Sequence, residues 1–577
     1  MTSRKFALAL LLGTSLTVAA QADGRDRPDI DHVLLISIDG MHSVDLINCV
    51  SDLPGVNGGV SYCPTLAKLK QSGLDYLDSQ TSRPSDSFPG LMAIVSGGTP
   101  RTVGAFYDVA YDRTLQPPAK TTGNGVAGSP NFCVPGQVPT GTRTEYEEGI
   151  DLDKTQRDGG GGNSGVASID PLKLPRDPAH NCNPVYPWNF VRTNTIFGVA
   201  HQAGLRTAWS DKHVAYSAVS GPGKGDNLDD FYSPEVNSTS ANLPGVTTST
   251  GVNCTTLPDQ PAFLAGGDYT TSFANIQCYD QLKVNGILNQ IDGMTHDRKM
   301  PARTPNLFGM NFQAVSVGQK LIEPPVRGGY LDNSGTPSAA LLSEIRYVDS
   351  AIGSMVSELK AHGLYDDTLI VITAKHGQSP VDSPRYTGIT STGPVTTSPA
   401  TILDNAGCLP VSEAPSNPTG IGPTEDDVSL IWLNGNCTTG QAVKLLETTS
   451  PASNNIAGIG QIISGRQLSQ LFGAPGLPPQ SDPRTPDIVV TSNVGVTYSG
   501  SSKKQAEHGG FAHDDTNVIM LLSNPKLPAV TVGTPVQTTQ VAPSILKALG
   551  LDPNALDSVR IEGTEVLPLV GSIFGDR

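Results

Sequence analysis

Residues 32–40, HVLLISIDG, decide the fold class. The apolar run from Val33 to Ile38 is almost continuous and does not alternate with polar residues. Such a run is typical of a strand buried on both faces, as in a parallel sheet covered by helices. Asp39 follows at once, where open α/β sheets place functional carboxylates, although an ordinary Asp-Gly turn is the alternative. We therefore expect an α/β fold and take Asp39 as a candidate site residue.

The remaining chain alternates between segments with helical and with strand-like patterns. Strands are predicted at 205–210, 368–374, 428–433, 487–491 and 517–522. Helices are predicted at 64–73, 195–204, 282–294, 339–364, 440–448 and 537–549. Polar, loop-like stretches at about 107–188, 222–277 and 379–423 read as insertions. We expect one domain, residues 23–577, with a mostly parallel central sheet flanked by helices and interrupted by these insertions.

Residues 1–22, MTSRKFALALLLGTSLTVAAQA, have the pattern of a secretory signal peptide. Two basic residues precede a short apolar run, and Ala20-Gln21-Ala22 forms an A-x-A cleavage signal before Asp23. A membrane anchor is the alternative, but the apolar run is short for a bilayer span and no later segment is long enough. The sequence therefore predicts a secreted or periplasmic protein without a membrane span.

The cysteines and the net charge narrow the kinds of site that the protein can carry. An even number of eight cysteines, none in a CxxC pair, indicates disulfides rather than a thiolate metal site. Sequential pairing is our hypothesis, since connectivity does not follow from sequence: 49–63, 133–182, 254–278 and 408–437. A net charge of −16 argues against a nucleic-acid-binding surface but permits a phosphate ester beside a local cation. The sequence makes no prediction of oligomeric state.

Residues 83–98, RPSDSFPGLMAIVSGG, contain the candidate nucleophile. A turn-prone run leads to Ser87, and Pro89 followed by an apolar stretch predicts a buried helix starting there. A hydroxyl at a helix N-terminus lies where backbone N–H groups and the helix dipole favour an anion, so Ser87 could attack a phosphate ester. Alternatively, Ser87 only caps the helix.

Further candidates follow two late segments. His376, in Lys375-His376-Gly377, comes after the strand at 368–374, and His508-Gly509 precedes the last strand. Carboxylate, hydroxyl and imidazole groups together suit Zn²⁺ or a similar divalent ion, which would activate the serine.

The order of these motifs resembles the alkaline phosphatase superfamily, and most closely its type I phosphodiesterase/nucleotide pyrophosphatase branch. The resemblance rests on Ile38-Asp39-Gly40, Ser87-Phe88-Pro89, strand-His376-Gly377 and His508-Gly509, and on shorter matches at 64–66, 95–100 and 542–546. It spans about residues 31–567, nearly the whole mature chain. It implies an alkaline-phosphatase-like fold and a phosphodiester or pyrophosphate hydrolase acting on a small-molecule phosphate ester.

The resemblance also implies roles for single residues. Asp39, Ser87 and His376 would bind one metal ion. Ser87 would also be the nucleophile that forms a covalent seryl-phosphoryl intermediate. His508 would be a ligand of a second metal ion.

Several residues depart from the family pattern. The family usually has Asp-His-Gly where this chain has Lys375-His376-Gly377, and Lys375 could stabilise the transferred group electrostatically. The family's metal-binding Asp and His, four residues apart, correspond best to Asn311, a weak neutral ligand at most, and to Val315. Gly90 stands where the family often has an asparagine that contacts phosphate. We therefore expect one divalent ion, zinc, rather than two.

Three further polar residues are candidates for substrate binding, as Asn311 and Gly90 are. His513 and Asp514 lie in a loop dense in possible ligands, and His213 follows the strand at 205–210. The alternative for His513 and Asp514 is a solvated loop without a function in binding, and the alternative for His213 is a surface turn. Two other functions remain open: a catalytically inactive binding protein on the same scaffold, and a phosphomonoesterase or sulfatase-like hydrolase, although the sulfatase C/S-x-P-x-R signature is absent at Ser87.

Overall fold

The computed structural model describes residues 29–119, 133–146, 149–241, 243–389, 397–409, 424–448 and 458–575. The expected signal peptide, residues 1–22, lies outside the described residues, as do parts of the insertions expected at 107–188 and 379–423. Within the described part of the chain, no helix combines the length and the apolar character that crossing a bilayer requires.

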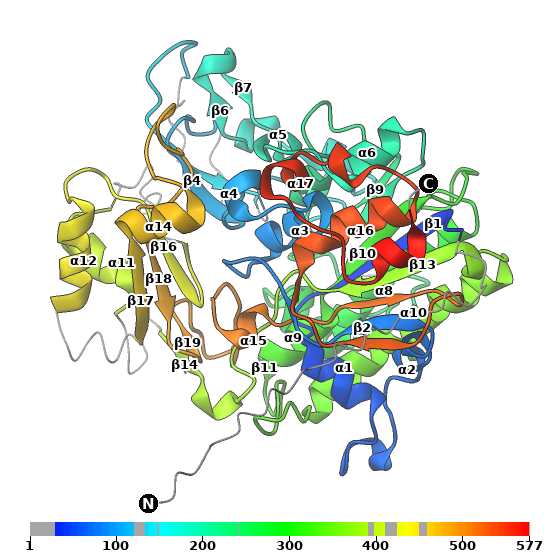
Figure 1. The fold of residues 1–577 in the computed structure, drawn as a ribbon. Coiled ribbons are helices and arrows are strands. Elements are labelled where there is room, and N and C mark those ends of the chain that lie inside the picture. The colour runs from blue at the N-terminus through cyan, green and yellow to red at the C-terminus, as the bar shows by residue number, and fades with distance from the viewer. Residues whose placement is uncertain are drawn as a thin grey trace, which may run out of the picture.

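An eight-stranded sheet forms the centre of the molecule, in the order β21-β2-β20-β13-β1-β10-β8-β9 (Figure 1). β1 (His32–Ile38) pairs in parallel with β10 (Leu307–Phe312) and with β13 (Thr368–Thr373). Only β20 (Leu521–Ser523) is antiparallel to its neighbours, β13 and β2. The other strands are β2 (Gly73–Tyr76), β8 (Ala208–Ser210), β9 (Asp230–Tyr232) and β21 (Val530–Val532). The predicted mostly parallel α/β sheet is confirmed.

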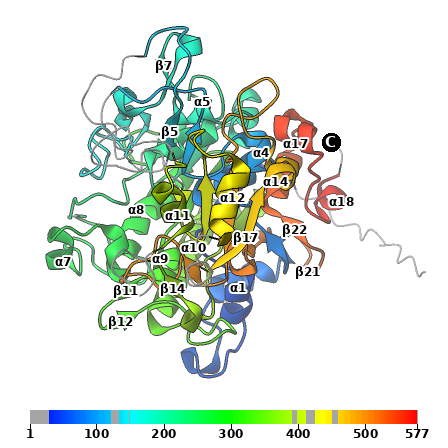
Figure 2. The same cartoon turned by 90° about the vertical axis from the view of Figure 1, so that its left-hand side faces the viewer.

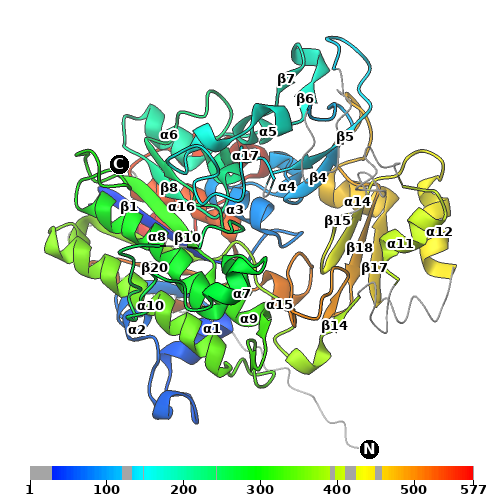
Figure 3. The same ribbon diagram turned by 180° about the vertical axis from the view of Figure 1, so that it is seen from behind.

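Helices cover both faces of this sheet because alternate residues of its strands point to opposite sides. Leu34, Ile36 and Ile38 pack into one core, and Val33 and Leu35 into the other. The first core is covered by α2 (Pro64–Lys70), α8 (Phe273–Ile291), α9 (Ala314–Lys320) and α10 (Ala339–Ala361), in front in Figure 3. The second is covered by α3 (Ser87–Ser96), α6 (Ile196–Gln202) and α16 (Val541–Ala548).

A second sheet forms a smaller lobe at one side of the molecule (Figures 1 and 2). Its antiparallel strands are β15 (Thr424–Glu425), β16 (Val428–Ile431), β18 (Ile488–Ser492) and β17 (Ile459–Ser464). α11 (Pro399–Asn405) and α12 (Thr439–Thr448) pack on one face, while α14 (Gly465–Phe472) and β4 (Val109–Asp112) contribute to the other. α11 corrects the loop predicted at 379–423, because Ser398 caps a helix that begins with Pro399.

The remaining elements are short. The helices are α1 (Ser43–Val50), α4 (Pro100–Val103), α5 (Pro187–Phe190), α7 (Gln260–Leu264), α15 (His513–Thr516), α17 (Asp557–Glu562) and α18 (Val570–Phe574). The strands are β3 (Ser79–Gln80), β5 (Thr142–Glu145), β6 (Arg176–Asp177), β7 (Asn183–Pro184), β11 (Ile322–Glu323), β12 (Val326–Arg327), β14 (Thr387–Gly388), β19 (Val496–Thr497) and β22 (Val536–Gln537).

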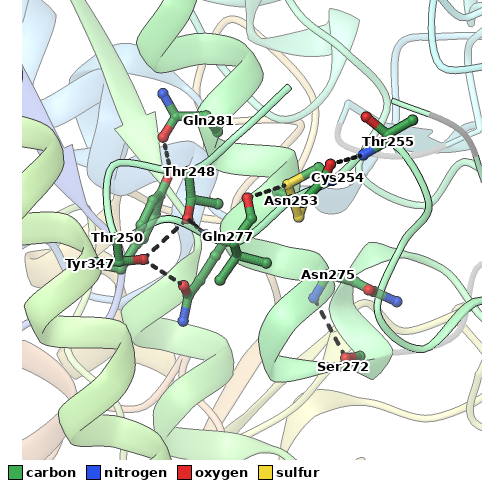
Figure 4. Close-up of a disulfide and its surroundings, with 12 residues drawn as sticks. Thr248, Thr250, Asn253, Cys254, Thr255, Ser272, Asn275, Gln277, Gln281 and Tyr347 are labelled. Atoms are coloured by element: carbon green, nitrogen blue, oxygen red, sulfur yellow. Dashed lines mark hydrogen bonds between the residues drawn. A yellow bond between two sulfur atoms is a disulfide. The ribbon is translucent and has the colours of Figure 1, made fainter. Parts of the chain in front are cut away.

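All four predicted disulfides are confirmed: Cys49–Cys63, Cys133–Cys182, Cys254–Cys278 and Cys408–Cys437. Figure 4 shows the third, which joins the excursion before α7 to the first turns of α8. The same excursion is tied to its surroundings by side chains, since Gln281 of α8 accepts a hydrogen bond from Ser249 N at 3.0 Å. This disulfide therefore fastens a long loop to the helical layer.

Candidate active site

The N-terminus of α3 carries Ser87, and the aspartate before it caps the helix. Asp86 is the N-cap, and its Oδ2 accepts hydrogen bonds from the backbone N–H groups of Phe88 and Asp108, both at 3.0 Å. Ser87 is the first helical residue and is fully buried. The alternative that Ser87 caps the helix is therefore wrong, since Asp86 performs that role and the serine hydroxyl is available for other contacts.

Asp39 lies at the carboxyl end of β1, as expected from residues 32–40. Asn311 Nδ2 donates to its Oδ1 and Gln313 Nε2 donates to its Oδ2, both at 2.7 Å. Burial opposes ionisation of Asp39, but the positive charge of Lys375 and the neighbouring His376 hold its pKa well below the usual range. Asp39 is therefore a buried carboxylate that is ionised at neutral pH.

The two predicted histidines meet beside this carboxylate. The rings of His376 and His508 stack with centroids 3.9 Å apart, and His376 Nε2 lies 3.6 Å from Asp39 Oδ2. His508 Nδ1 lies 3.7 Å from Oδ1 of Asp86, the residue before the candidate nucleophile. Burial beside His376 lowers the pKa of His508 well below its ordinary value, so this ring is neutral at pH 7.

Lys212 is the site residue that sequence reasoning did not select. Its Nζ donates to Ser87 Oγ at 3.0 Å, from the loop that follows β8. Lys375, which was selected, instead forms a fully buried ion pair with Asp211, with Nζ 2.7 Å from Oδ1. The signal for Lys212 was its place directly after a strand of the central sheet, where α/β folds build their sites.

A close backbone contact explains why residue 90 is a glycine. A Cβ atom added to it would lie 2.1 Å from the backbone oxygen of Lys375. The first turn of α3 therefore packs directly against the main chain that carries Lys375. In this structure an asparagine, as the family often has there, does not fit at position 90.

The other predicted residues divide into two groups. Asn311 belongs to the site through its hydrogen bond to Asp39. His213 is buried with Nδ1 3.0 Å from Glu235 Oε1. His513 is exposed at the start of α15, and Asp514 Oδ2 accepts a hydrogen bond from Val381 N at 2.9 Å. The hydrogen bonds described for these last three residues do not include Ser87 or Asp39.

His376 and Asp39 offer one pair of ligand atoms of the kind that binds a divalent ion. Nδ1 of His376 lies 2.8 Å from Gly377 O, which leaves a lone pair on Nε2, 3.6 Å from Asp39 Oδ2. A carboxylate and an imidazole are ligand types that suit a divalent ion. Among the described residues, the one group of three His, Cys, Asp or Glu ligand atoms within 4.8 Å of one another is Asp292, Glu358 and His362, at the ends of α8 and α10.

Two buried acids, Asp427 and Asp515, contact the backbone of the loops that carry His508 and His376. Asp427 N donates to His508 O at 3.1 Å, and Asp515 O accepts from Gly377 N at 2.7 Å. Burial raises the pKa of Asp515 to about 7, and burial together with the charge of Asp515 raises that of Asp427 well above its ordinary value. The two carboxyl groups are therefore protonated more readily in the folded than in the unfolded chain.

This pair predicts that the protein loses stability as the pH rises. Because the folded-state pKa values exceed the unfolded value of about 3.9, unfolding releases protons, and stability falls between about pH 4 and pH 7. Asp515→Asn is expected to reduce this fall by about 2 kcal/mol. The free energy of unfolding, measured in urea at pH 5 and pH 8, gives this fall for each protein. Asp366→Asn, at an exposed position, is the control. An unchanged pH dependence in Asp515→Asn would contradict the prediction.

Comparison with known proteins decides the family. The sequence profile of the type I phosphodiesterase/nucleotide pyrophosphatase family matches residues 33–148 and 330–514, together more than half of the chain. The chain belongs to this family. The matched ranges include Asp39, Ser87, Lys375, His376 and His508. Lys212 and Asn311 lie between the two matched ranges. As a member of the type I phosphodiesterase/nucleotide pyrophosphatase family, the chain is a hydrolase of the phosphodiesterase type.

Solved structures give a more distant similarity. Murine ectonucleotide pyrophosphatase/phosphodiesterase 5 is 13% identical, with a TM-score of 0.49, over 90% of this chain and 96% of that one. The human protein of the same name is 11% identical, with a TM-score of 0.48, over 90% of this chain and 95% of that one. No curated protein matches the chain.

Proposed function

We propose that this family member is a secreted or periplasmic hydrolase of phosphodiester or pyrophosphate bonds, with Ser87 as its nucleophile. The observation that carries the proposal is the position of Ser87 Oγ, on the first turn of α3 and 3.0 Å from Lys212 Nζ. A hydroxyl is a weak nucleophile on its own and needs a cationic environment to attack an anionic ester. The four disulfides and the N-terminal sequence support export, and we propose one hydrolase domain over residues 23–577.

The reaction would proceed in two displacements. Ser87 Oγ forms a bond to phosphorus while the bond from phosphorus to the leaving oxygen breaks; the serine proton passes to solvent, and the leaving group takes one from solvent. Water then attacks phosphorus, the Oγ–P bond breaks and the serine hydroxyl is restored. The N-terminal dipole of α3 and the ammonium of Lys212 both stabilise negative charge at this position.

A divalent ion, with zinc as our choice, would be held by Asp39, Ser87 and His376. When bound, it supplies Lewis acidity that lowers the pKa of the hydroxyl and neutralises ester charge. Asp39 is kept ionised for this role, and its two amide hydrogen bonds hold the carboxylate in place. His508 is neutral and could face the leaving group or water.

Burial limits the substrate to a small molecule. Ser87 and Asp39 are fully buried, and the most exposed side chains at the site are Lys212 and His508, at 7% and 9%. So deep a site favours a small phosphate ester over a polymer as the substrate.

Chelation tests this proposal. The purified chain is assayed with bis(p-nitrophenyl) phosphate and p-nitrophenyl phosphate, before and after dialysis against EDTA and after Zn²⁺ is restored. We expect the diester to be the better substrate, its rate to fall at least about 100-fold on chelation, and one zinc per chain to restore it. Preference for the monoester would favour a phosphomonoesterase. No hydrolysis with any metal would favour an inactive binding protein.

A further inference from the structure

Three positions at which the family pattern supplies metal ligands hold different chemistry in this chain. Lys375 replaces the aspartate before the histidine and pairs with Asp211. Asn311 donates an amide N–H to Asp39, and Val315 is fully buried in the hydrophobic core. These three positions therefore provide no carboxylate or imidazole that could bind a cation.

Two lysines occupy this region instead, and one aspartate holds both. Asp211 is fully buried; its Oδ1 accepts from Lys375 Nζ at 2.7 Å and from the backbone N–H of Lys212 at 2.9 Å. Its Oδ2 accepts from Trp209 Nε1 at 2.9 Å, which fixes the orientation of the carboxylate. Asp211 thereby fixes the ammonium of Lys375 and the main chain of Lys212.

The aromatic ring of Tyr216 lies beneath both ammonium groups. Lys375 Nζ is 4.1 Å from the centre of this ring and Lys212 Nζ is 5.9 Å from it. The face of an aromatic ring attracts cations, so Tyr216 helps to keep the two charges in this buried place. The Asp211 carboxylate pairs with Lys375, and the ammonium of Lys212 is the one in contact with Ser87 Oγ.

We propose that Lys212, supported by Lys375 and Asp211, binds the phosphoryl group transferred to Ser87 and takes the place of one of the family's two metal ions. The inference rests on the proposed function, because it takes Ser87 as the nucleophile. Lys212 Nζ lies 3.0 Å from Ser87 Oγ, so an oxygen of a phosphoryl group bonded to Oγ lies within its hydrogen-bonding reach. An ammonium donates charge-assisted hydrogen bonds to phosphate without needing a metal.

Phosphate binding by metal-free protein tests the inference. EDTA-treated wild-type protein is titrated with inorganic phosphate in a calorimeter, in parallel with Lys212→Met, Lys212→Arg and a control, Lys70→Met. Lys70 pairs with Asp75 at 2.6 Å outside the site, so the control removes a lysine ion pair that does not face Ser87. We expect Lys212→Met to bind phosphate roughly 10- to 100-fold more weakly, and Lys212→Arg and Lys70→Met to stay within about threefold of wild type.

The outcomes separate this inference from the proposed function. Unchanged binding in Lys212→Met, or no binding by metal-free wild type, overturns the role of Lys212 even if Ser87-dependent hydrolysis is found. If phosphate binding depends on Lys212 but the zinc-loaded protein hydrolyses nothing, the inference is supported and the proposed hydrolase function is refuted. Because Lys212→Arg keeps the charge, weak binding in both Lys212 variants with an unchanged melting temperature also counts against a charge role.

Discussion

Ser87→Ala is expected to lower the rate of bis(p-nitrophenyl) phosphate hydrolysis by at least about 1,000-fold while the protein stays folded. The variant removes the atom that would form the covalent bond to phosphorus. It leaves the start of α3 intact, because Asp86 and not Ser87 caps that helix. Steady-state kinetics on zinc-loaded protein, together with the melting temperature, measure both effects.

Ser96→Ala is the matched control for this variant. Ser96 is a buried serine at the other end of the same helix, and its Oγ donates to Met92 O at 2.7 Å. It should lose little rate and a modest amount of stability. A Ser87→Ala rate within about threefold of wild type would remove Ser87 from the reaction.

Lys375→Met is expected to destabilise the protein by about 3–5 kcal/mol, because it leaves the Asp211 carboxylate buried without its ion-pair partner. Methionine fills a similar volume, so the loss is mainly electrostatic. The same variant should reduce hydrolysis, since Lys375 also helps to keep Asp39 ionised. Urea unfolding at pH 7 measures the change in free energy.

A double-mutant cycle with Asp211→Asn identifies the cause of this loss. Removing both charges takes away the unpaired carboxylate, so the double variant should be more stable than the sum of the two single losses predicts, by roughly 1–3 kcal/mol. Strictly additive losses would mean that the pair is not coupled and would contradict the buried ion pair.

In the middle of the central sheet, β1 and β13 could be predicted and β10 could not, for a physical reason. β1 and β13 are nearly continuous apolar runs, which is the pattern of a strand buried on both faces. β10 escaped prediction because Gly309 breaks its pattern. That glycine is required there, since a Cβ would lie 1.8 Å from the oxygen of Leu35 on the neighbouring strand. The second sheet depends on pairing between distant segments, which no local pattern reveals.

The site could be predicted only in part. Asp39, Ser87 and His376 follow strands or begin a helix, so their sequence context indicates a place at the sheet edge. Lys212 follows only a three-residue strand, and its contact with Ser87 depends on how α3 and the loop after β8 pack together. The need for glycine at position 90 likewise becomes clear only from the carbonyl of Lys375 that lies against it.

Trapping the covalent intermediate tests the central claim most directly. Zinc-loaded protein is mixed with bis(p-nitrophenyl) phosphate, quenched in acid within the first turnover, digested and examined by mass spectrometry. We predict a p-nitrophenyl phosphoryl group on Ser87, in the peptide that contains residues 84–98, and none in Ser87→Ala. Turnover with an unmodified Ser87, or with the phosphoryl group on another residue, would contradict the account.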